Sequence, residues 1–199
     1  YQKYWPADLH LMAKDIIRFH AIIWPIMLMA ADIPLPKQVM AHGWLLMNDS
    51  KMSKSKGNVV DPVILANRYG VDTIRYFLLR EMAFGMDANY SEESLVNRMN
   101  IDLANDYGNL LSRTTSMMEK FCGGIVGAPG VGTEFDADLI ALAKETPVVG
   151  ASYFDKTDLA NGLAAIWKLI NKANKYIDDV APWALNKAGE KEKLQTVLY

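Results

Sequence analysis

Cysteine is almost absent from the sequence, since Cys122 is the single one among 199 residues. A lone cysteine excludes an internal disulfide framework and any zinc site built from four cysteines, and it fits a reducing, cytoplasmic compartment. The three histidines, His10, His20 and His42, have no neighbouring cysteine or paired acidic residues at metal-ligand spacing. We therefore expect no metal site in this chain.

A strong charge of either sign is also lacking, since 21 basic residues stand against 23 acidic ones and the net charge is −2. Overall charge gives no indication of nucleic acid, and any RNA contact must come from local patches. Long hydrophobic runs are missing too: polar residues and a proline interrupt the apolar stretch 16–33, at Arg18, His20, Pro25 and Asp32. These interruptions argue against a membrane span, and we expect no membrane partner.

A starting methionine and a signal peptide are missing as well. The chain opens at Tyr1 in the middle of a pattern and closes inside the apolar run 197–199, so we expect a fragment of a longer protein. Hydrophobic residues make up 51% of the chain, which predicts a packed globular structure.

The most informative stretch that is present is the lysine-rich segment 51–58. An apolar, strand-like run at 39–47 precedes it, and Asp61-Pro62 after it is typical of a helix start with Asp61 as N-cap. Flexible lysines beside the N–H groups of a helix N-terminus suit a polyphosphate, above all one that gains charge in a transition state. An arbitrary lysine cluster would instead be a solvated basic loop.

Residues 1–90 predict an α/β arrangement. A short strand near 8–12, a helix over 15–31 and a strand at 39–42 follow one another, and this order favours a βαβ unit with parallel strands. Pro25 must kink or interrupt the helix, because it lacks an N–H and its ring clashes with the preceding turn. A complete doubly wound sheet needs more strands, and we expect the missing ones upstream.

Helices are predicted for most of the remaining chain. Two short ones, 61–69 and 71–80, are separated by Gly70 as a C-cap. Residues 91–199 then predict an all-α bundle of three long helices, over about 91–121, 136–153 and from Asp155 to a break at Pro182, with a glycine-rich loop at 123–133. The apolar stripe of the first long helix comprises Val96, Met99, Leu103, Leu110 and Met117.

Four residues of the first helix predict a pocket. Asp15, Phe19, His20 and Trp24 follow one another at spacings of four, one and four, which puts them on a broad shared face of an α-helix. A carboxylate, a phenyl, an imidazole and an indole together suit an amino acid with an apolar side chain. The alternative is an amphipathic helix with a core phenylalanine and tryptophan and a hydrogen-bonded histidine.

Three residues of the second half are candidates for RNA contact. Asn109 and Arg113 lie four apart on one helix face, where an amide and a guanidinium suit the base edges of an unpaired loop. Trp183 follows Pro182 at a helix break, and an exposed indole there would stack on a base. The alternatives are a surface hydrogen-bonding pair and a core tryptophan.

The segment Lys51-Met52-Ser53-Lys54-Ser55 is the KMSKS motif of class I aminoacyl-tRNA synthetases. The flanking segments 14–20 and 76–81 resemble methionyl-tRNA synthetases of the bacterial type, and the resemblance covers nearly the whole chain. KMSKS alone would leave the leucine, isoleucine and valine enzymes open, and these remain the alternative within the class. A non-catalytic tRNA-binding module is the alternative from a different class.

The resemblance implies a fold, substrates and site residues. Residues 1–90 would be the C-terminal part of a Rossmann-like catalytic domain, and residues 91–199 an anticodon-binding bundle. The implied substrates are ATP with Mg²⁺, methionine and tRNA(Met). The implied site residues are Lys51 and Lys54 for catalysis; Lys54, Ser53, Ser55 and Asp15 for ATP; Asp15, Phe19, His20 and Trp24 for methionine; and Asn109, Arg113 and Trp183 for the anticodon.

The chain departs from the family pattern in two ways. Ala13 stands where the family usually has a glycine, which puts the geometry of Asp15 in question because glycine allows close backbone approach to a nucleotide. The HIGH motif of class I synthetases is missing, so we expect it upstream, together with any zinc-bearing insertion. We therefore predict that the 199-residue chain alone does not activate methionine.

Overall fold

A computed structural model describes residues 2–47, 49–53, 55 and 57–199 and divides the chain into two compact units. The first unit comprises Tyr1–Glu92 with Thr157–Ala160, and the second comprises Glu93–Lys156 with Asn161–Tyr199. Within the described part of the chain, no helix combines the length and the hydropathy needed to cross a membrane.

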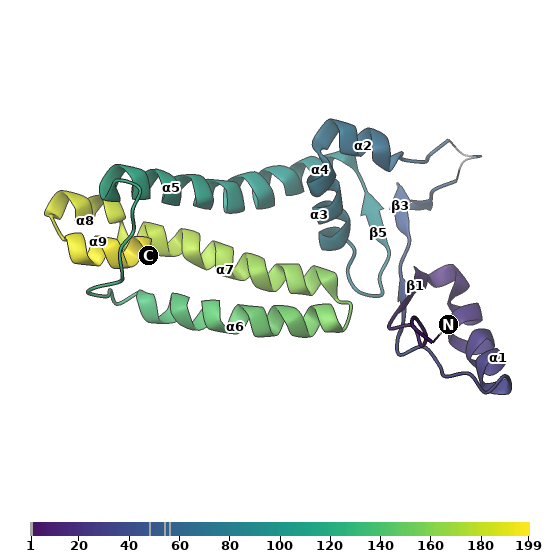
Figure 1. Ribbon diagram of the computed structural model, residues 1–199. Helices are drawn as coiled ribbons and strands as arrows, with labels where there is room; N and C mark the ends of the chain where they lie inside the picture. The colour runs from purple at the N-terminus through teal and green to yellow at the C-terminus, as the bar shows by residue number, and fades with distance from the viewer. Residues whose placement is uncertain (1, 48, 54, 56) are drawn as a thin grey trace. The chain divides into compact units, whose positions relative to one another are not determined.

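A parallel strand pair opens the first unit (Figure 1). Strand β1, His10–Ala13, pairs with β2, Val39–His42, so that His10 lies opposite Val39 and Ala13 opposite His42. The prediction of a strand–helix–strand unit with parallel strands is confirmed. The first strand begins two residues later than the sequence pattern indicates.

The helical segment between these strands changes its hydrogen-bond pattern twice. It runs as a 3₁₀ turn at Lys14–Ile16, a π turn at Phe19–Ile23 and helix α1 at Trp24–Ala30. The N–H of Trp24 donates to the carbonyl of Phe19, five residues back, directly before Pro25. At normal α-helical spacing, the ring of Pro25 would clash with a carbonyl of the preceding turn. The wider π turn makes room for the ring, so the helix continues through Pro25. The interruption predicted at Pro25 is therefore a local change in the pitch of a continuous helical segment.

A second small sheet has β3, Leu45–Met47, at its centre. Strand β4, Ser50–Lys51, pairs with it antiparallel, and β5, Ala88–Tyr90, pairs with it parallel. Gly43 precedes this sheet where the backbone leaves no room for a side chain, since a Cβ atom there would lie 2.0 Å from the carbonyl oxygen of Met86.

Helices α2, Pro62–Tyr69, and α3, Val71–Glu81, follow the lysine-rich segment. The carboxylate of Asp61 accepts a 2.8 Å hydrogen bond from the N–H of Val63, so the predicted N-cap is confirmed. Gly70 ends α2 at a φ of +87°, which favours glycine. Phe77 on α3 is 1% exposed and packs edge-on against Tyr90, with 6.0 Å between the ring centroids.

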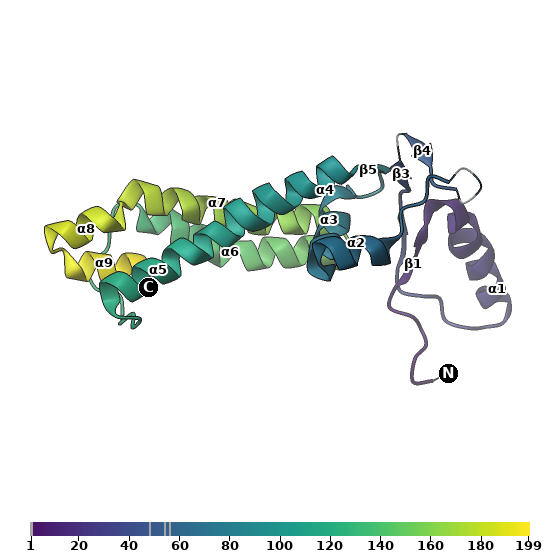
Figure 2. The ribbon, with the colours of Figure 1, turned by 90° about the horizontal axis from the view of Figure 1, so that it is seen from above.

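The second unit is helical, as predicted (Figure 1, Figure 2). Its elements are α4, Glu92–Arg98; a π-helical stretch η4, Met99–Gly108; α5, Asn109–Cys122; α6, Asp136–Asp155; α7, Leu159–Val180; α8, Pro182–Ala188; and α9, Lys191–Leu198. Helix α6 runs through Asp155 and α7 begins only at Leu159, so the prediction that Asp155 opens the last long helix is wrong. Thr157, at a φ of +61°, lies in the turn between them.

Two side chains of α7 donate hydrogen bonds to the backbone of the π-helical stretch. The indole N–H of Trp167 donates to the carbonyl of Asp102 at 3.3 Å, and the amide of Asn174 donates to the carbonyl of Asp106 at 2.9 Å. The predicted stripe of the first long helix is only half-buried, whereas Leu95 is fully buried and Asp102 is 5% exposed. The π turns rotate the buried face away from the α-helical prediction.

Candidate active site

The lysine-rich segment joins strand β4 to helix α2. Lys51 ends β4, while Lys54, the other lysine predicted to be catalytic, lies outside the described residues. Asn58 closes the segment on itself, because its Oδ1 accepts from the N–H of Ser53 at 2.8 Å and its Nδ2 donates to the carbonyl of Lys51 at 3.3 Å. The hydroxyls of Ser53 and Ser55 lie 2.8 Å apart.

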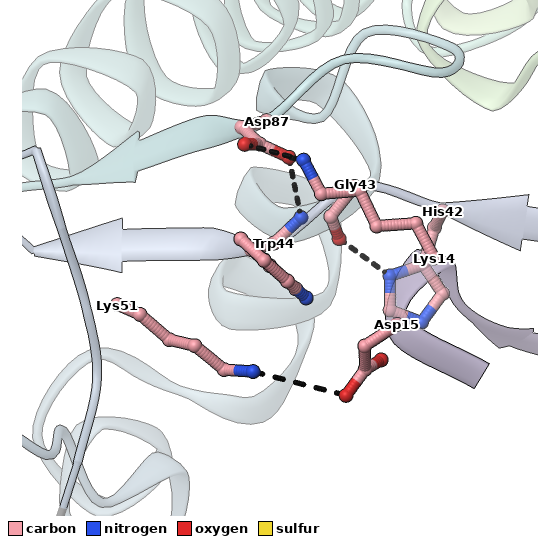
Figure 3. Close-up of polar contacts among 7 residues, drawn as sticks. All are labelled: Lys14, Asp15, His42, Gly43, Trp44, Lys51 and Asp87. Carbon is pink, nitrogen blue, oxygen red and sulfur yellow. Dashed lines mark hydrogen bonds and ion pairs between the residues drawn. The ribbon is translucent and has the colours of Figure 1, made fainter.

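Trp44 lies between two lysines (Figure 3). The Nζ atom of Lys14 is 4.2 Å from the centre of its indole ring, and that of Lys51 is 4.3 Å away. Lys14 follows β1, whereas Trp44 precedes β3 and Lys51 ends the neighbouring strand β4, so a residue about 30 positions upstream meets the β3–β4 hairpin here. Ammonium groups over an indole face are attracted by its negative quadrupole.

Two carboxylates complete this group of residues. Asp87 binds Lys14, with Nζ–O distances of 2.6 and 2.7 Å, and accepts a 2.9 Å hydrogen bond from the backbone N–H of Trp44. The hydrogen bond from Lys14, with that from Trp44, lowers the pKa of Asp87 below its usual range. Asp15 faces Lys51 at 3.7 Å (Figure 3). The site thus carries two cations and two carboxylates around one aromatic ring.

An apolar hollow of about 360 Å³ lies along the helical segment that follows β1. Phe19, His20 and Trp24 line it, so the structure brings together three of the four residues predicted to form a pocket. Asp15 does not line the hollow and faces Lys51 instead. The spacing argument assumed one continuous α-helix, whereas Asp15 lies in a 3₁₀ turn and Phe19 and His20 in a π turn.

The hollow contains polar atoms as well as apolar surface. Nδ1 of His20 donates to the carbonyl of Ile16 at 3.0 Å, and Nε2 is the other nitrogen of the imidazole ring. Nε1 of Trp24 and Nδ1 of His10 are buried and have no hydrogen-bond partner in the described part of the chain. Trp5 packs edge-on against Trp24, with 6.2 Å between ring centroids.

Several residues of this region were missed by the sequence reasoning. From the sequence, Lys14 stands out only as part of segment 14–20, Trp44 only as part of the apolar run 39–47, and neither Asp87 nor His10 as a site residue. The position of Lys14, next to Asp15 at the end of a strand, is the one local feature that pointed to a site. Within the described residues, no group of three histidine, cysteine, aspartate or glutamate side chains is placed to hold a metal ion.

The predicted RNA-contact residues all lie in the second unit. Asn109 is exposed at the start of α5, and one turn later Arg113 forms a 2.6 Å ion pair with Asp178 on α7. Trp183 is 47% exposed near the start of α8, so it is not a core tryptophan. Ala181, at a φ of +50°, makes the break between α7 and α8.

The fold is that of a class I tRNA synthetase. The family model described as tRNA synthetases class I (M) matches residues 1–115, and the chain belongs to this family.

Curated relatives and solved structures agree with this assignment. The chain is 57% identical over 200 residues to the methionine–tRNA ligase of Caldanaerobacter subterraneus subsp. tengcongensis, and 55% identical over 201 residues to that of Bacillus subtilis. These matches cover 100% of this chain but only 31% and 30% of the relatives. The crystal structure of Mycobacterium tuberculosis methionyl-tRNA synthetase bound by methionyl-adenylate matches with a TM-score of 0.93 and 48% identity, covering 100% of this chain and 39% of that one.

Proposed function

We propose that this chain is part of a longer methionine–tRNA ligase and combines the KMSKS-bearing part of its catalytic domain with its anticodon-binding bundle. The arrangement of Lys51 beside Trp44 and Asp15, on a lysine-rich segment that leads into a capped helix, carries the proposal. The similarity to methionine–tRNA ligases over 100% of the chain supports methionine rather than leucine, isoleucine or valine as the amino acid.

The proposed reaction has two steps. The methionine carboxylate attacks the α-phosphate of ATP, a substrate that enters as its Mg²⁺ complex, and pyrophosphate leaves. The terminal ribose of tRNA(Met) then attacks the aminoacyl carbonyl of the adenylate and AMP leaves. No protein nucleophile takes part, so the chain contributes positioning and electrostatic stabilisation. Lys51 and Lys54 offset charge on the departing pyrophosphate, and Ser53, Ser55 and Asp15 bind ATP.

The hollow beside Phe19, His20 and Trp24 is the proposed methionine site. Its lining is largely apolar, which suits a thioether side chain, and the aromatic ring of Trp24 favours contact with sulfur. The buried Nε1 of Trp24 is a hydrogen-bond donor with no partner in the described residues, so it is one polar group that a bound amino acid would satisfy.

Single-turnover adenylate formation by the full-length protein that contains this chain tests the catalytic assignment. We expect Lys54→Ala to slow this step by roughly 10²–10³, because the lysine acts on charge that grows in the transition state. Lys37→Ala, which removes an exposed lysine paired with Asp8, is the matched control and should leave the rate unchanged. A rate for Lys54→Ala within about threefold of the parent would refute the assignment.

A second candidate function is tRNA binding without catalysis. The exposed indole of Trp183 and the guanidinium of Arg113 favour it, because both suit an unpaired RNA loop. Methionine-dependent exchange of pyrophosphate into ATP separates the two functions, since a binding module exchanges no label. The same assay with leucine, isoleucine and valine tests the other class I specificities.

A further inference from the structure

The backbone around Trp44 is pinned on both sides. Gly43 approaches the backbone of Met86 so closely that a Cβ atom would lie 2.0 Å from its carbonyl oxygen. The next residue, Trp44, donates its N–H to the carboxylate of Asp87 at 2.9 Å. These contacts tie the segment 43–44 to the segment 86–87 just before β3 and β5 pair, so the backbone that carries the indole is held in place.

The two lysines on this indole are held differently. Lys14 contacts the indole at 4.2 Å and is locked by both oxygens of Asp87, at 2.6 and 2.7 Å. Lys51 contacts the indole at 4.3 Å, but its carboxylate neighbour, Asp15, is 3.7 Å away. Figure 3 shows the indole between the two ammonium groups. The ring therefore contributes a larger share of the restraint on Lys51 than on Lys14.

We propose that Trp44 is a positioning residue for the lysine that meets the departing pyrophosphate: its indole holds the ammonium of Lys51, while Lys14 and Asp87 fix the indole from its other side. The inference rests on the proposed function. It adds to that function an aromatic residue outside the lysine-rich segment itself.

An aromatic partner suits this role better than a carboxylate does. A carboxylate that paired tightly with Lys51 would neutralise the charge and occupy the N–H donors that a phosphate needs. The face of an indole attracts the ammonium but accepts none of its hydrogen bonds at full strength. Lys51 can therefore exchange its weak contact with Asp15 for a phosphate oxygen while the ring keeps it in place.

Substitution of Trp44 by fluorinated tryptophans in the full-length protein tests this inference. One, two and three fluorine atoms progressively weaken the quadrupole of the ring and barely change its shape. We expect the single-turnover rate of adenylate formation to fall stepwise along this series, reaching about three- to tenfold for Trp44→Leu, which removes the ring. Tyr4→Leu removes a comparable but exposed contact, with Lys3 Nζ 5.2 Å from the Tyr4 ring, and should leave the rate unchanged.

A double-mutant cycle shows whether Trp44 acts through Lys51. If it does, Trp44→Leu slows the Lys51→Ala protein much less than it slows the parent. In addition, the ε-methylene protons of Lys14 and Lys51 should show ring-current shifts in NMR spectra that disappear in Trp44→Leu. This readout depends on the geometry and not on turnover.

The possible results separate this inference from the proposed function. Equal rates across the fluorinated series, or equal effects of Trp44→Leu with and without Lys51, would overturn the role of Trp44. A normal rate for both Lys51→Ala and Lys54→Ala would instead overturn the catalytic role of the lysine-rich segment. Slow adenylate formation in Lys51→Ala, together with a full rate in Trp44→Leu, leaves the proposed function intact and rejects the inference.

Discussion

Trp24 is the residue at which a binding role and a packing role can be separated most directly. It lines the hollow, and its ring packs edge-on against Trp5. If it borders methionine, Trp24→Ala should raise the methionine concentration needed for half-maximal exchange and leave ATP binding nearly unchanged. If it acts in packing, the same change should destabilise the fold by roughly 3–5 kcal/mol.

Thermal melting and methionine titration of the same variant decide between these roles. Trp24→Phe is the companion variant, because it keeps an aromatic ring in the hollow but removes the buried Nε1 donor that a bound amino acid would satisfy. A lower melting temperature with unchanged methionine affinity would favour packing and count against the methionine site.

Asp87 makes the stability of the first unit depend on pH in the acid range. Its pKa is lowered in the folded state, chiefly by the hydrogen bond from Lys14, so the folded protein favours the ionised carboxylate. The stabilisation is fully present above the unfolded-state pKa, about 3.9, and is lost as the pH falls through the lowered, folded-state pKa. We therefore expect the gap in melting temperature between the parent and Asp87→Asn to be constant above about pH 5 and to close towards pH 2.

The exposed carboxylate of Asp8, which pairs with Lys37, offers the comparison for this experiment. Asp8→Asn should change the melting temperature far less than Asp87→Asn at pH 7, because an exposed ion pair contributes little. A melting-temperature gap for Asp87→Asn that does not change with pH would show that ionisation of the Asp87 carboxylate is not the source of the stabilisation.

At the scale of single elements, the cap of helix α2 is the clearest case of a local feature. Asp61 accepts the N–H of Val63 at 2.8 Å, at the point where the lysine-rich segment enters the helix. Asp61→Ala should destabilise the first unit by about 0.5–2 kcal/mol, whereas Asp61→Asn, an equally good cap, should cost little. Equilibrium urea unfolding of the three proteins measures this, and equal losses for both substitutions would argue against a capping role.

The two π-helical stretches are the elements that the sequence pattern did not predict. Apolar spacing indicates a helix over 15–31 and another over 91–121, and both exist. The spacing does not distinguish an i→i−4 ladder from an i→i−5 ladder, because each leaves an apolar side facing the core. The π turn at 19–23, with the 3₁₀ turn before it, leaves Asp15 outside the hollow, and the π turn at 99–108 buries Asp102 in place of the predicted stripe.

At the scale of the whole molecule, the two units should carry separable functions. We expect Trp183→Ala to weaken tRNA binding by about 1–3 kcal/mol, the range for loss of one stacked base, and to leave pyrophosphate exchange in the full-length protein almost unchanged. Arg113→Ala should also weaken binding and reduce discrimination between cognate and altered anticodons.

Aminoacylation of cognate and anticodon-changed tRNA, measured beside pyrophosphate exchange, checks this separation. Asp178→Ala is an informative companion, because it frees the Arg113 guanidinium from the 2.6 Å ion pair without removing the arginine. Equal losses of aminoacylation and exchange in Trp183→Ala would mean that the indole supports the fold, and the anticodon role would then be abandoned.

The sequence by itself determined features whose causes act within a few residues. Asp61 caps α2 and Gly70 ends it, because a side-chain acceptor and a permitted positive φ are local properties. The order of strand, helix and strand likewise follows from local periodicity and predicts a parallel pair. The KMSKS motif is contiguous, so its recognition needed no structure.

The tertiary structure alone decided which distant residues meet. The pairing of β1 with β2 brings Lys14 close to Trp44, and the pairing of β3 with β5, with the close approach at Gly43, brings Trp44 close to Asp87. Arg113 meets Asp178 only because the fold brings α5 and α7 within reach of each other. Local propensities contain no information on strand register or on helix rotation, since both are set by packing between segments far apart in the chain. For this reason the lysine-rich segment could be found in the sequence. The position of the Trp44 ring between Lys51 of that segment and the distant Lys14 could not.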